Sequence, residues 1–442
     1  MTRFIAVVIV VAAACVAQEG PAPLRLTLKQ AVDIALAPEG NARIQIAEQL
    51  TRQAEARSAQ ARAALLPDLA SSISQQNQTR NLAAFGIRIQ IPIPGFTFPE
   101  VVGPFNTFDT RATAVQNIFD LPSVRRYQAS RAGVATAKAE CTSTEDQVVQ
   151  QVARLYLAAL RADAALETAK ANVALGEALA ALAEDRRRAG TGTGLDVTRA
   201  RVQLAHERQR RVVAENERAR AYLELLRAMG VKLGTVLALT DKLAYAAVEP
   251  VTVERAIQTA LQSRSDLAAQ QRREESARLS SSAASFERLP SLVGFADYGS
   301  IGASINHGLP TRTYGVSVRL PLYDGGRRGA RRQENLAAWR QEQIRTRDLR
   351  EQIELAIRVA LDALRSAADQ VKVAEEGLAL AESELAQARR RFEAGVTSSL
   401  EVTDAQTRLQ RARDNQIAAL FQHNLARLDL AQAMGTLRET IQ

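Results

Sequence analysis

The sequence predicts a mainly α-helical protein with a smaller β-strand part, built by an internal duplication. Ala, Leu, Arg, Glu and Gln dominate the 442 residues, and aromatic residues make up only 4%. This composition is typical of long helices that pack through narrow apolar stripes. From about residue 123 to 189 the chain contains no proline and little glycine. A helix of roughly 67 residues would be about 100 Å long.

Two turn sequences with a constant offset indicate the duplication. Residues 188–197 read RAGTGTGLDV and residues 393–402 read EAGVTSSLEV. Gly190 aligns with Gly395 and Asp196 with Glu401, each pair 205 residues apart. An offset that holds over about forty residues is the signature of a repeated unit. We expect each turn to be the tip of a long helical hairpin.

The charge pattern favours a solvated helix surface. The net charge is +9, and most of the positive charge comes from Arg. Arg alternates with Glu and Asp, and the sequence has no basic block with interleaved aromatics. We therefore expect ion pairs on helix surfaces and no nucleic-acid partner.

Residues 1–17 predict an export signal. A positive Arg3 precedes a run of apolar residues that is too short to span a bilayer. Cleavage after Ala17 is one expectation. The other is that Ala13-Ala14-Cys15 is a lipobox with a lipidated Cys15, although Ala12 stands where Leu is usual. In both cases Cys141 has no partner for an intrachain disulfide, and we expect it to be a small buried or interhelical residue.

The first repeat is expected over residues 18–250 and the second over 251–442. Each opens with a short amphipathic helix and a longer helix, predicted at 26–36 and 41–66 in the first repeat. The sequence LTLKQAV at 26–32 is similar to VTVERAI at 251–257, and LLPDL at 65–69 is similar to RLPSL at 288–292.

After each of these prolines the apolar period changes from 3.6 to 2, which predicts strands. We expect strands near residues 69–79, 107–119, 292–303 and 312–323. In the last, Tyr314, Val316, Val318, Leu320 and Leu322 alternate with mostly polar residues. An apolar face about ten residues long fits a transmembrane strand, although a half-buried soluble hairpin has the same pattern. The proline-rich segment 81–106 is predicted to be a long external loop.

The long helices are expected to form hairpins over residues 123–229 and 326–434, with return helices at 195–229 and 400–434. Apolar spacing near seven predicts a coiled-coil-like seam in the return helices. Its members are Leu195, Val202, Gln209 and Val213 in one helix, and Leu400, Thr407, Ile417, Leu420 and Leu428 in the other. Four strands cannot close a barrel by themselves, so a chain that crosses a membrane this way must oligomerise.

In the order of its parts the chain resembles the TolC-like outer-membrane efflux proteins. The resemblance covers almost the whole mature chain and rests on the duplicated order, the two tip turns, the strand exits Ile118-Phe119-Asp120 and Leu322-Tyr323-Asp324, and the ending at 433–437. It implies a homotrimer with a 12-stranded β-barrel in the outer membrane, continued by a 12-helix α-barrel in the periplasm. It also implies that the segment near 231–250 packs with the two termini as a belt.

The resemblance assigns roles to the tips. They would contact a periplasmic adaptor (membrane fusion) protein through Gly190, Thr191, Gly192 and Thr193, and through Gly395, Val396, Thr397 and Ser398. The alternative for Gly190 and Gly395 is turn geometry, because glycine readily adopts positive φ.

Asp196, Glu401 and Asp404 would line the pore constriction and favour cations, and only the second repeat has the paired carboxylates Glu401 and Asp404. Acids near a helix N-terminus can instead complement the helix dipole. The chain departs from the family pattern for a lock between the hairpins, since it has Phe392 and Thr397 where the family would use Tyr and Arg. Arg188, Arg199 or Arg391 are candidates to replace that lock.

The sequence predicts no enzyme and no cofactor. The glycines at 190–194 lie between two helices, not after a strand as in nucleotide loops. His206, His307 and His423 lack metal-ligand spacing, so no metal site is expected.

The expected function is a passive outer-membrane exit duct that works with an adaptor and an inner-membrane pump of RND, ABC or MFS type. The alternatives are the outer-membrane component of type I protein secretion and, in another class, a non-channel periplasmic coiled-coil scaffold.

Overall fold

The computed structural model describes residues 23–87, 95 and 99–441. The signal segment 1–17, with Cys15, and most of the proline-rich stretch 91–99 lie outside these residues. Contacts divide the chain into two units. The hairpin unit takes its described residues from 1–45, 145–256 and 356–442, and the sheet unit consists of 46–144 and 257–355. Each unit therefore contains segments of both sequence repeats, and each is described separately.

The sheet unit contains a four-stranded antiparallel sheet in the order β2-β3-β5-β6. The strands are β2 (Asp68–Asn81), β3 (Val101–Phe119), β5 (Ser291–Gly302) and β6 (Leu309–Arg319). They confirm strands at all four predicted places. Pairing of β3 with β5 joins the two repeats in the middle of the sheet and leaves β2 and β6 as its edges.

Two strand boundaries differ from the prediction. β3 begins at Val101, so the end of the predicted loop 81–106 is strand, because Val101, Val102 and Phe105 pair with β2. β6 ends at Arg319 opposite Ser291, the first residue of β5. Leu320 and Leu322 therefore have no strand to pair with and lie outside the sheet.

The predicted apolar face of β6 is exposed in the single chain. Tyr314 is 80% exposed, Val316 62% and Val318 68%. Exposed apolar patches of this kind mark a surface that contacts something other than water.

Helices continue the sheet unit. They include α2 (Ala42–Ala63), α6 (Ser265–Phe286) and the first parts of α3 (Leu121–Arg188) and α7 (Arg327–Glu393). α2 ends before the predicted residue 66 because Leu65 and Leu66 donate to carbonyls three residues back, in a tightened last turn before Pro67. Glu287 at the end of α6 binds Arg126 of α3 at 2.6 Å and Arg331 of α7 at 3.1 Å.

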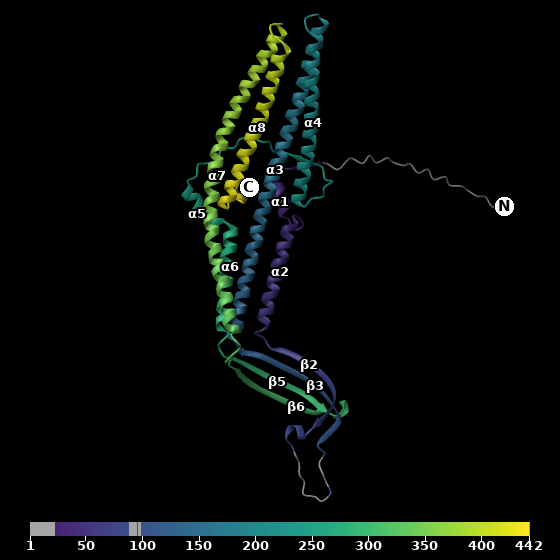
Figure 1. The fold of residues 1–442 in the computed structure, drawn as a ribbon, viewed down its shortest axis with the longest axis vertical. Coiled ribbons are helices and arrows are strands. Elements are labelled where there is room, and N and C mark those ends of the chain that lie inside the picture. Colours follow the sequence, from purple (N-terminus) through teal and green to yellow (C-terminus); the bar gives the residue numbers. More distant parts are fainter. Residues whose placement is uncertain (1–22, 88–94, 96–98, 442) are drawn as a thin grey trace, which may run out of the picture. The chain divides into compact units, whose positions relative to one another are not determined.

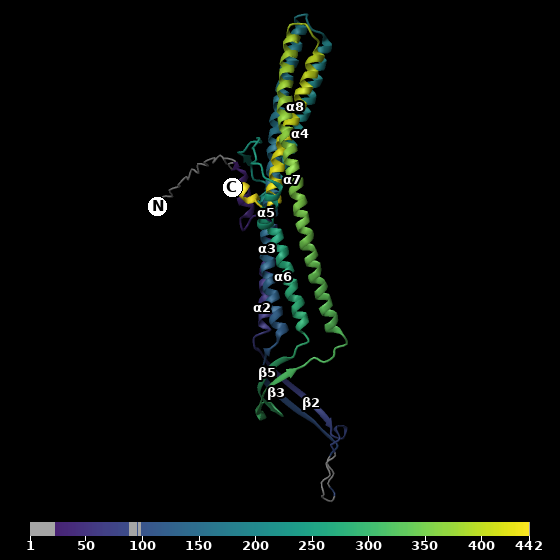
Figure 2. The same ribbon diagram turned by 90° about the vertical axis from the view of Figure 1, so that its left-hand side faces the viewer.

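The hairpin unit contains the two predicted hairpins. α4 (Gly194–Met229) returns along α3, and α8 (Ser399–Met434) returns along α7, as Figures 1 and 2 show. α4 and α8 also contact each other. α3 begins at Leu121 instead of residue 123, because Pro122 is tolerated in the first helical turn, where its missing N–H would be unpaired in any case. No helix among the described residues has an apolar stretch long enough to cross a membrane.

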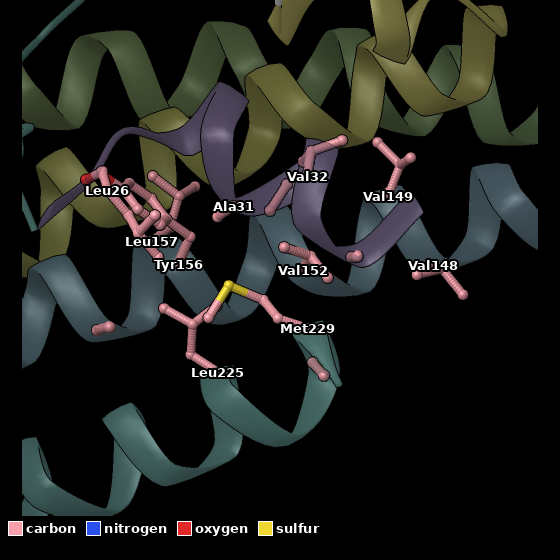
Figure 3. Close-up of a cluster of buried hydrophobic side chains, with 14 of the residues drawn as sticks. Leu26, Ala31, Val32, Val148, Val149, Val152, Tyr156, Leu157, Leu225 and Met229 are labelled. Carbon is pink, nitrogen blue, oxygen red and sulfur yellow. The ribbon is translucent and has the colours of Figure 1, made fainter. Parts of the chain in front are cut away.

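The main core lies where the termini meet the hairpins. Tyr156, Leu225 and Met229 are buried between α3, α4 and α1 (Leu28–Leu36), as Figure 3 shows. The Tyr156 hydroxyl donates to the carbonyl of Leu26 at 3.0 Å.

The remaining short elements surround this core. β1 (Leu24–Leu26) pairs in parallel with β4 (Leu237–Leu239), and Leu437 of α9 (Leu437–Ile441) packs in the same core. The predicted packing of segment 231–250 with both ends of the chain is therefore confirmed. α5 (Val253–Ser263) contains the boundary between the two units.

The predicted seam of the return helices is wrong for α4, whereas in α8 its member Leu428 is buried and its member Leu400 is exposed. Leu195, Val202 and Val213 are each more than half exposed. The helix faces its neighbours with other residues, among them Val197 and Ala214. In α8 the buried set near the tip is Val402, Ala405 and Leu409, packed with Leu385, Ala388 and Phe392 of α7. Val402 and Leu409 are also seven residues apart, so the predicted spacing holds in this stripe while the predicted residues do not. Small alanines let the two helices approach closely along it.

Candidate functional site at the hairpin tips

The two tip turns have the same backbone design. Gly190 has φ +74° and donates to the carbonyl of Arg187 at 3.1 Å, while Thr191 donates to that of Arg186 at 3.0 Å. Gly395 likewise has φ +74° and donates to Phe392 at 3.0 Å, and Val396 donates to Arg391 at 3.0 Å. This pair of bonds is the Schellman C-cap, in which glycine takes the left-handed position. Turn geometry therefore accounts for both glycines.

The residues predicted to meet an adaptor lie at these tips. Six of them are exposed and two are half-buried, and the half-buried ones are Gly192 and Thr397. Val396 is the apolar member and is 71% exposed. The tip surface is therefore made of backbone, hydroxyl groups and one apolar side chain.

Asp196 caps the helix that leaves the first tip. The amide of Asp196 donates to Oγ1 of Thr193 at 3.2 Å, and the amide of Thr193 donates to Oδ2 of Asp196 at 3.1 Å. This reciprocal pair is a capping box, which satisfies two amides that the helix leaves unpaired. Of the two roles considered for Asp196, lining the pore or stabilising a helix N-terminus, the structure therefore shows the second.

Asp196 also reaches the other hairpin. The Ser399 hydroxyl, in the first turn of α8, donates to Oδ1 of Asp196. Ser399 is only 7% exposed. The hydrogen bond from Ser399, followed by that from Thr193, lowers the pKa of Asp196 below its ordinary value. Asp196 is therefore an ionised link between the two tips.

A second link joins the hairpins beside the first. The guanidinium of Arg186, in the last turn of α3, lies 4.3 Å from the centre of the Phe392 ring of α7. Phe392 is buried at 6% exposure, so the cation covers the face of an otherwise shielded ring. Arg186 Nη2 also donates to the carbonyl of Thr191 at 3.3 Å, which holds the side chain over its own turn.

The second tip neutralises its own glutamate. Arg391 Nη1 lies 3.2 Å from Oε1 of Glu401, and the Thr397 hydroxyl donates to Oε2 of the same carboxylate. Asp404 lies one turn later and is exposed. The paired carboxylates of the second repeat therefore differ in their surroundings, because Arg391 of the same hairpin pairs with Glu401, whereas Asp404 is exposed to solvent.

The three arginines considered for the lock have separate places. Arg188 pairs with Asp185 in its own helix, and Arg391 pairs with Glu401. Arg199 acts on Asp196 only through its charge, which helps to lower the pKa of Asp196. At the tips, the contacts between hairpins come instead from Ser399 and Arg186, which the sequence did not indicate. The closeness of Ser399 to the second tip in the sequence was the only signal that could have indicated this contact.

Within residues 23–87, 95 and 99–441, no group of three His, Cys, Asp or Glu side chains could hold a metal ion. Cys141 lies on α3 and is partly exposed, so the buried alternative is wrong and the interhelical one stays a prediction.

Comparisons with known proteins agree with this architecture. The profile of the outer membrane efflux protein family matches residues 34–231 and 256–436. Outer membrane protein TolC of Vibrio cholerae is 26% identical over 317 residues, covering 69% of this chain and 71% of TolC. The outer-membrane channel OprN superposes with a TM-score of 0.79 at 20% identity, covering 92% of this chain and 90% of OprN. The Campylobacter jejuni CmeC outer membrane channel gives a TM-score of 0.79 at 17% identity, covering 93% and 86%.

Proposed function

Because the chain belongs to the outer membrane efflux protein family, whose members are outer-membrane channels and not enzymes, we propose that it forms the passive exit duct of a tripartite efflux system, gated at its hairpin tips. The observation that carries the gate is the link between the two hairpins through Asp196 and Ser399. Energy for transport would come from an inner-membrane pump.

The duct is a homotrimer in this proposal. A single sheet leaves β2 and β6 as edges whose backbone groups lipid cannot satisfy. Edge pairing between three copies would give a closed 12-stranded β-barrel, with the face of Tyr314, Val316 and Val318 toward outer-membrane lipid. The hairpins of three copies would form the 12-helix α-barrel in the periplasm. The two sequence repeats, 18–250 and 251–442, supply half of each part.

In this proposal the gate consists of two contacts between the hairpins at their tips. The Ser399 hydroxyl binds the Asp196 carboxylate, and Arg186 covers the Phe392 ring. Both contacts are weak enough to break at moderate cost, because a cation–π contact contributes roughly 0.5–2 kcal/mol. Separating the hairpins would dilate the tip.

Carboxylates near the tip would form the constriction. Asp196, Glu401 and Asp404 repeat in each copy, and their field would favour cations. Because Arg391 compensates Glu401, the uncompensated charge comes mainly from Asp196 and the exposed Asp404.

The tips would dock a periplasmic adaptor protein. Gly190 to Thr193 and Gly395 to Ser398 present backbone groups, hydroxyl groups and exposed Val396. Short side chains of this kind permit close interdigitation with a partner helix hairpin. The pump behind the adaptor would be of RND, ABC or MFS type.

Reconstitution in planar bilayers tests the duct. We expect the purified full-length protein to be a trimer and to conduct ions, with cations preferred. A variant with both hairpin links removed, Ser399→Ala with Arg186→Gln, should conduct more. If neither protein conducts, the proposal of a duct is wrong and the alternative of a non-channel scaffold is supported. A scaffold, however, would not explain the exposed apolar face of β6.

A further inference from the structure

A polar cavity lies within the hairpin unit, between α3, α4 and α8, away from the tips. Its volume is about 600 Å³. The polar groups that line it include Asn172 of α3, Gln203, Glu207 and Arg210 of α4, and Gln410 and Asp414 of α8. Most of these side chains are hydrogen-bonding amides or carboxylates. Glu207 is buried, whereas Arg210 and Asp414 are exposed, so the cavity opens to the surface of the helices.

Glu207 is the group that requires an explanation. Glu207 is only 1% exposed. Oε1 accepts a hydrogen bond from Nε2 of Gln203 at 2.8 Å. Oε2 is buried and has no hydrogen-bond partner among the described residues. Glu207 also forms no ion pair with any residue that the structure describes. A buried carboxylate oxygen without a donor is costly and points to a missing partner.

The charges around the cavity indicate the kind of partner. Carboxylates of Glu207, Glu217 and Asp414 line it, against the single guanidinium of Arg210 and the ring of His206. Burial raises the pKa of Glu207, and the negative charge of Asp414 adds to this effect. Burial also raises the pKa of Asp414. The charge of Arg210 opposes burial at both carboxylates, one on each hairpin, but a single guanidinium faces three carboxylates.

The arrangement of acidic and amide side chains favours an amine over a metal ion. No described group of His, Cys, Asp or Glu side chains is arranged to hold a metal. An ammonium group brings three N–H donors, which would match the free Oε2 of Glu207, the Asp414 carboxylate and an amide carbonyl oxygen such as that of Gln410.

We propose that this cavity binds a small organic ammonium ion, held between the carboxylates of Glu207 on α4 and Asp414 on α8. The ligand would join the first hairpin to the return helix of the second. The site depends only on the hairpin unit and stands whether or not the protein conducts ions.

Calorimetric titration of the detergent-solubilised full-length protein with 1,5-diaminopentane at pH 8 tests the site. We expect saturable binding, weakened about tenfold or more in Glu207→Gln, because hydrogen bonds to a charged group are lost. Glu207→Gln keeps the shape and the bond to Gln203, so its folding should be preserved. Asp414→Asn supplies a second, independent variant with the same expected loss.

The matched control is Glu215→Gln, a carboxylate on the same helix that is exposed and paired with Arg211. It should bind the amine as the unmodified protein does. The proposal is overturned if the unmodified protein takes up no amine at millimolar concentration, if both pocket variants bind unchanged, or if Mg²⁺ displaces the amine by occupying the same site.

Discussion

Ser399 donates a hydrogen bond to Asp196 across 203 residues of sequence, and this bond ties the two helical hairpins together at their tips. The acceptor also completes the capping box of α4 with Thr193, so one carboxylate fixes a helix end and a contact between hairpins. A change in its protonation would weaken both.

Replacing Ser399 with Ala should loosen the tip. It removes the main cause of the lowered pKa of Asp196, so that pKa should rise toward its ordinary value of 3.8. We expect a higher open probability in planar bilayers at pH 7. Ser398→Ala is the matched control, because the Ser398 side chain makes no capping hydrogen bond to α8. Equal open probabilities for the two variants would remove Ser399 from the gate.

The same bond predicts the response to acid. A lowered pKa means that the folded state favours ionised Asp196. Its stabilisation is therefore fully present above 3.8 and is lost as pH falls through the folded-state pKa below that value. In the unmodified protein the open probability should rise only below pH 3.8. Ser399→Ala lacks this bond, so its open probability should already be high at pH 7 and should rise little further in acid.

The contact of Arg186 with Phe392 should behave as a coupled pair. We expect a double-mutant cycle of Arg186→Gln and Phe392→Leu, measured on the ratio of open to closed channels, to give a coupling of about 0.5–2 kcal/mol. Phe392→Tyr keeps the ring and should keep the coupling. A coupling of zero would reduce the contact to simple packing.

Arg391 should set the charge of the second tip. Arg391→Gln frees Glu401 from its ion pair, so the permeability ratio of cations to anions should increase, while Asp404→Asn should decrease it. Reversal potentials in a salt gradient measure both. Asp362→Asn, an exposed carboxylate elsewhere on α7, should leave the ratio unchanged.

Strand β6 allows a test of which face meets lipid. Tyr314→Arg places a charge on the exposed apolar face and should destabilise the protein in a bilayer by about 2–4 kcal/mol if the residue lies near the midplane. Thr313→Arg changes the neighbouring residue on the opposite face and should insert nearly as the unmodified chain does. Protease protection in liposomes compares the two, and equal insertion would contradict the assigned face.

Local features of the chain were readable without a structure. The glycines of the two tips, the helices between them and the four strands follow from turn preference, helix propensity and apolar period, which act over a few residues. The constant offset of 205 residues between Gly190 and Gly395 also required only the sequence. These predictions succeeded because each depends on neighbours along the chain.

Contacts between distant segments needed the tertiary structure. The sequence alone did not indicate that Ser399 would face Asp196, that Arg186 would cover Phe392, or that Glu207 would be 1% exposed in a helix of mostly exposed charges. The wrong residues were predicted for the seam of α4 for the same reason, since Leu195 and Val202 are more than half exposed in the single chain. Sequence period defines which residues share a face of a helix, whereas the rotation of each helix is decided by which face packs most closely against the others.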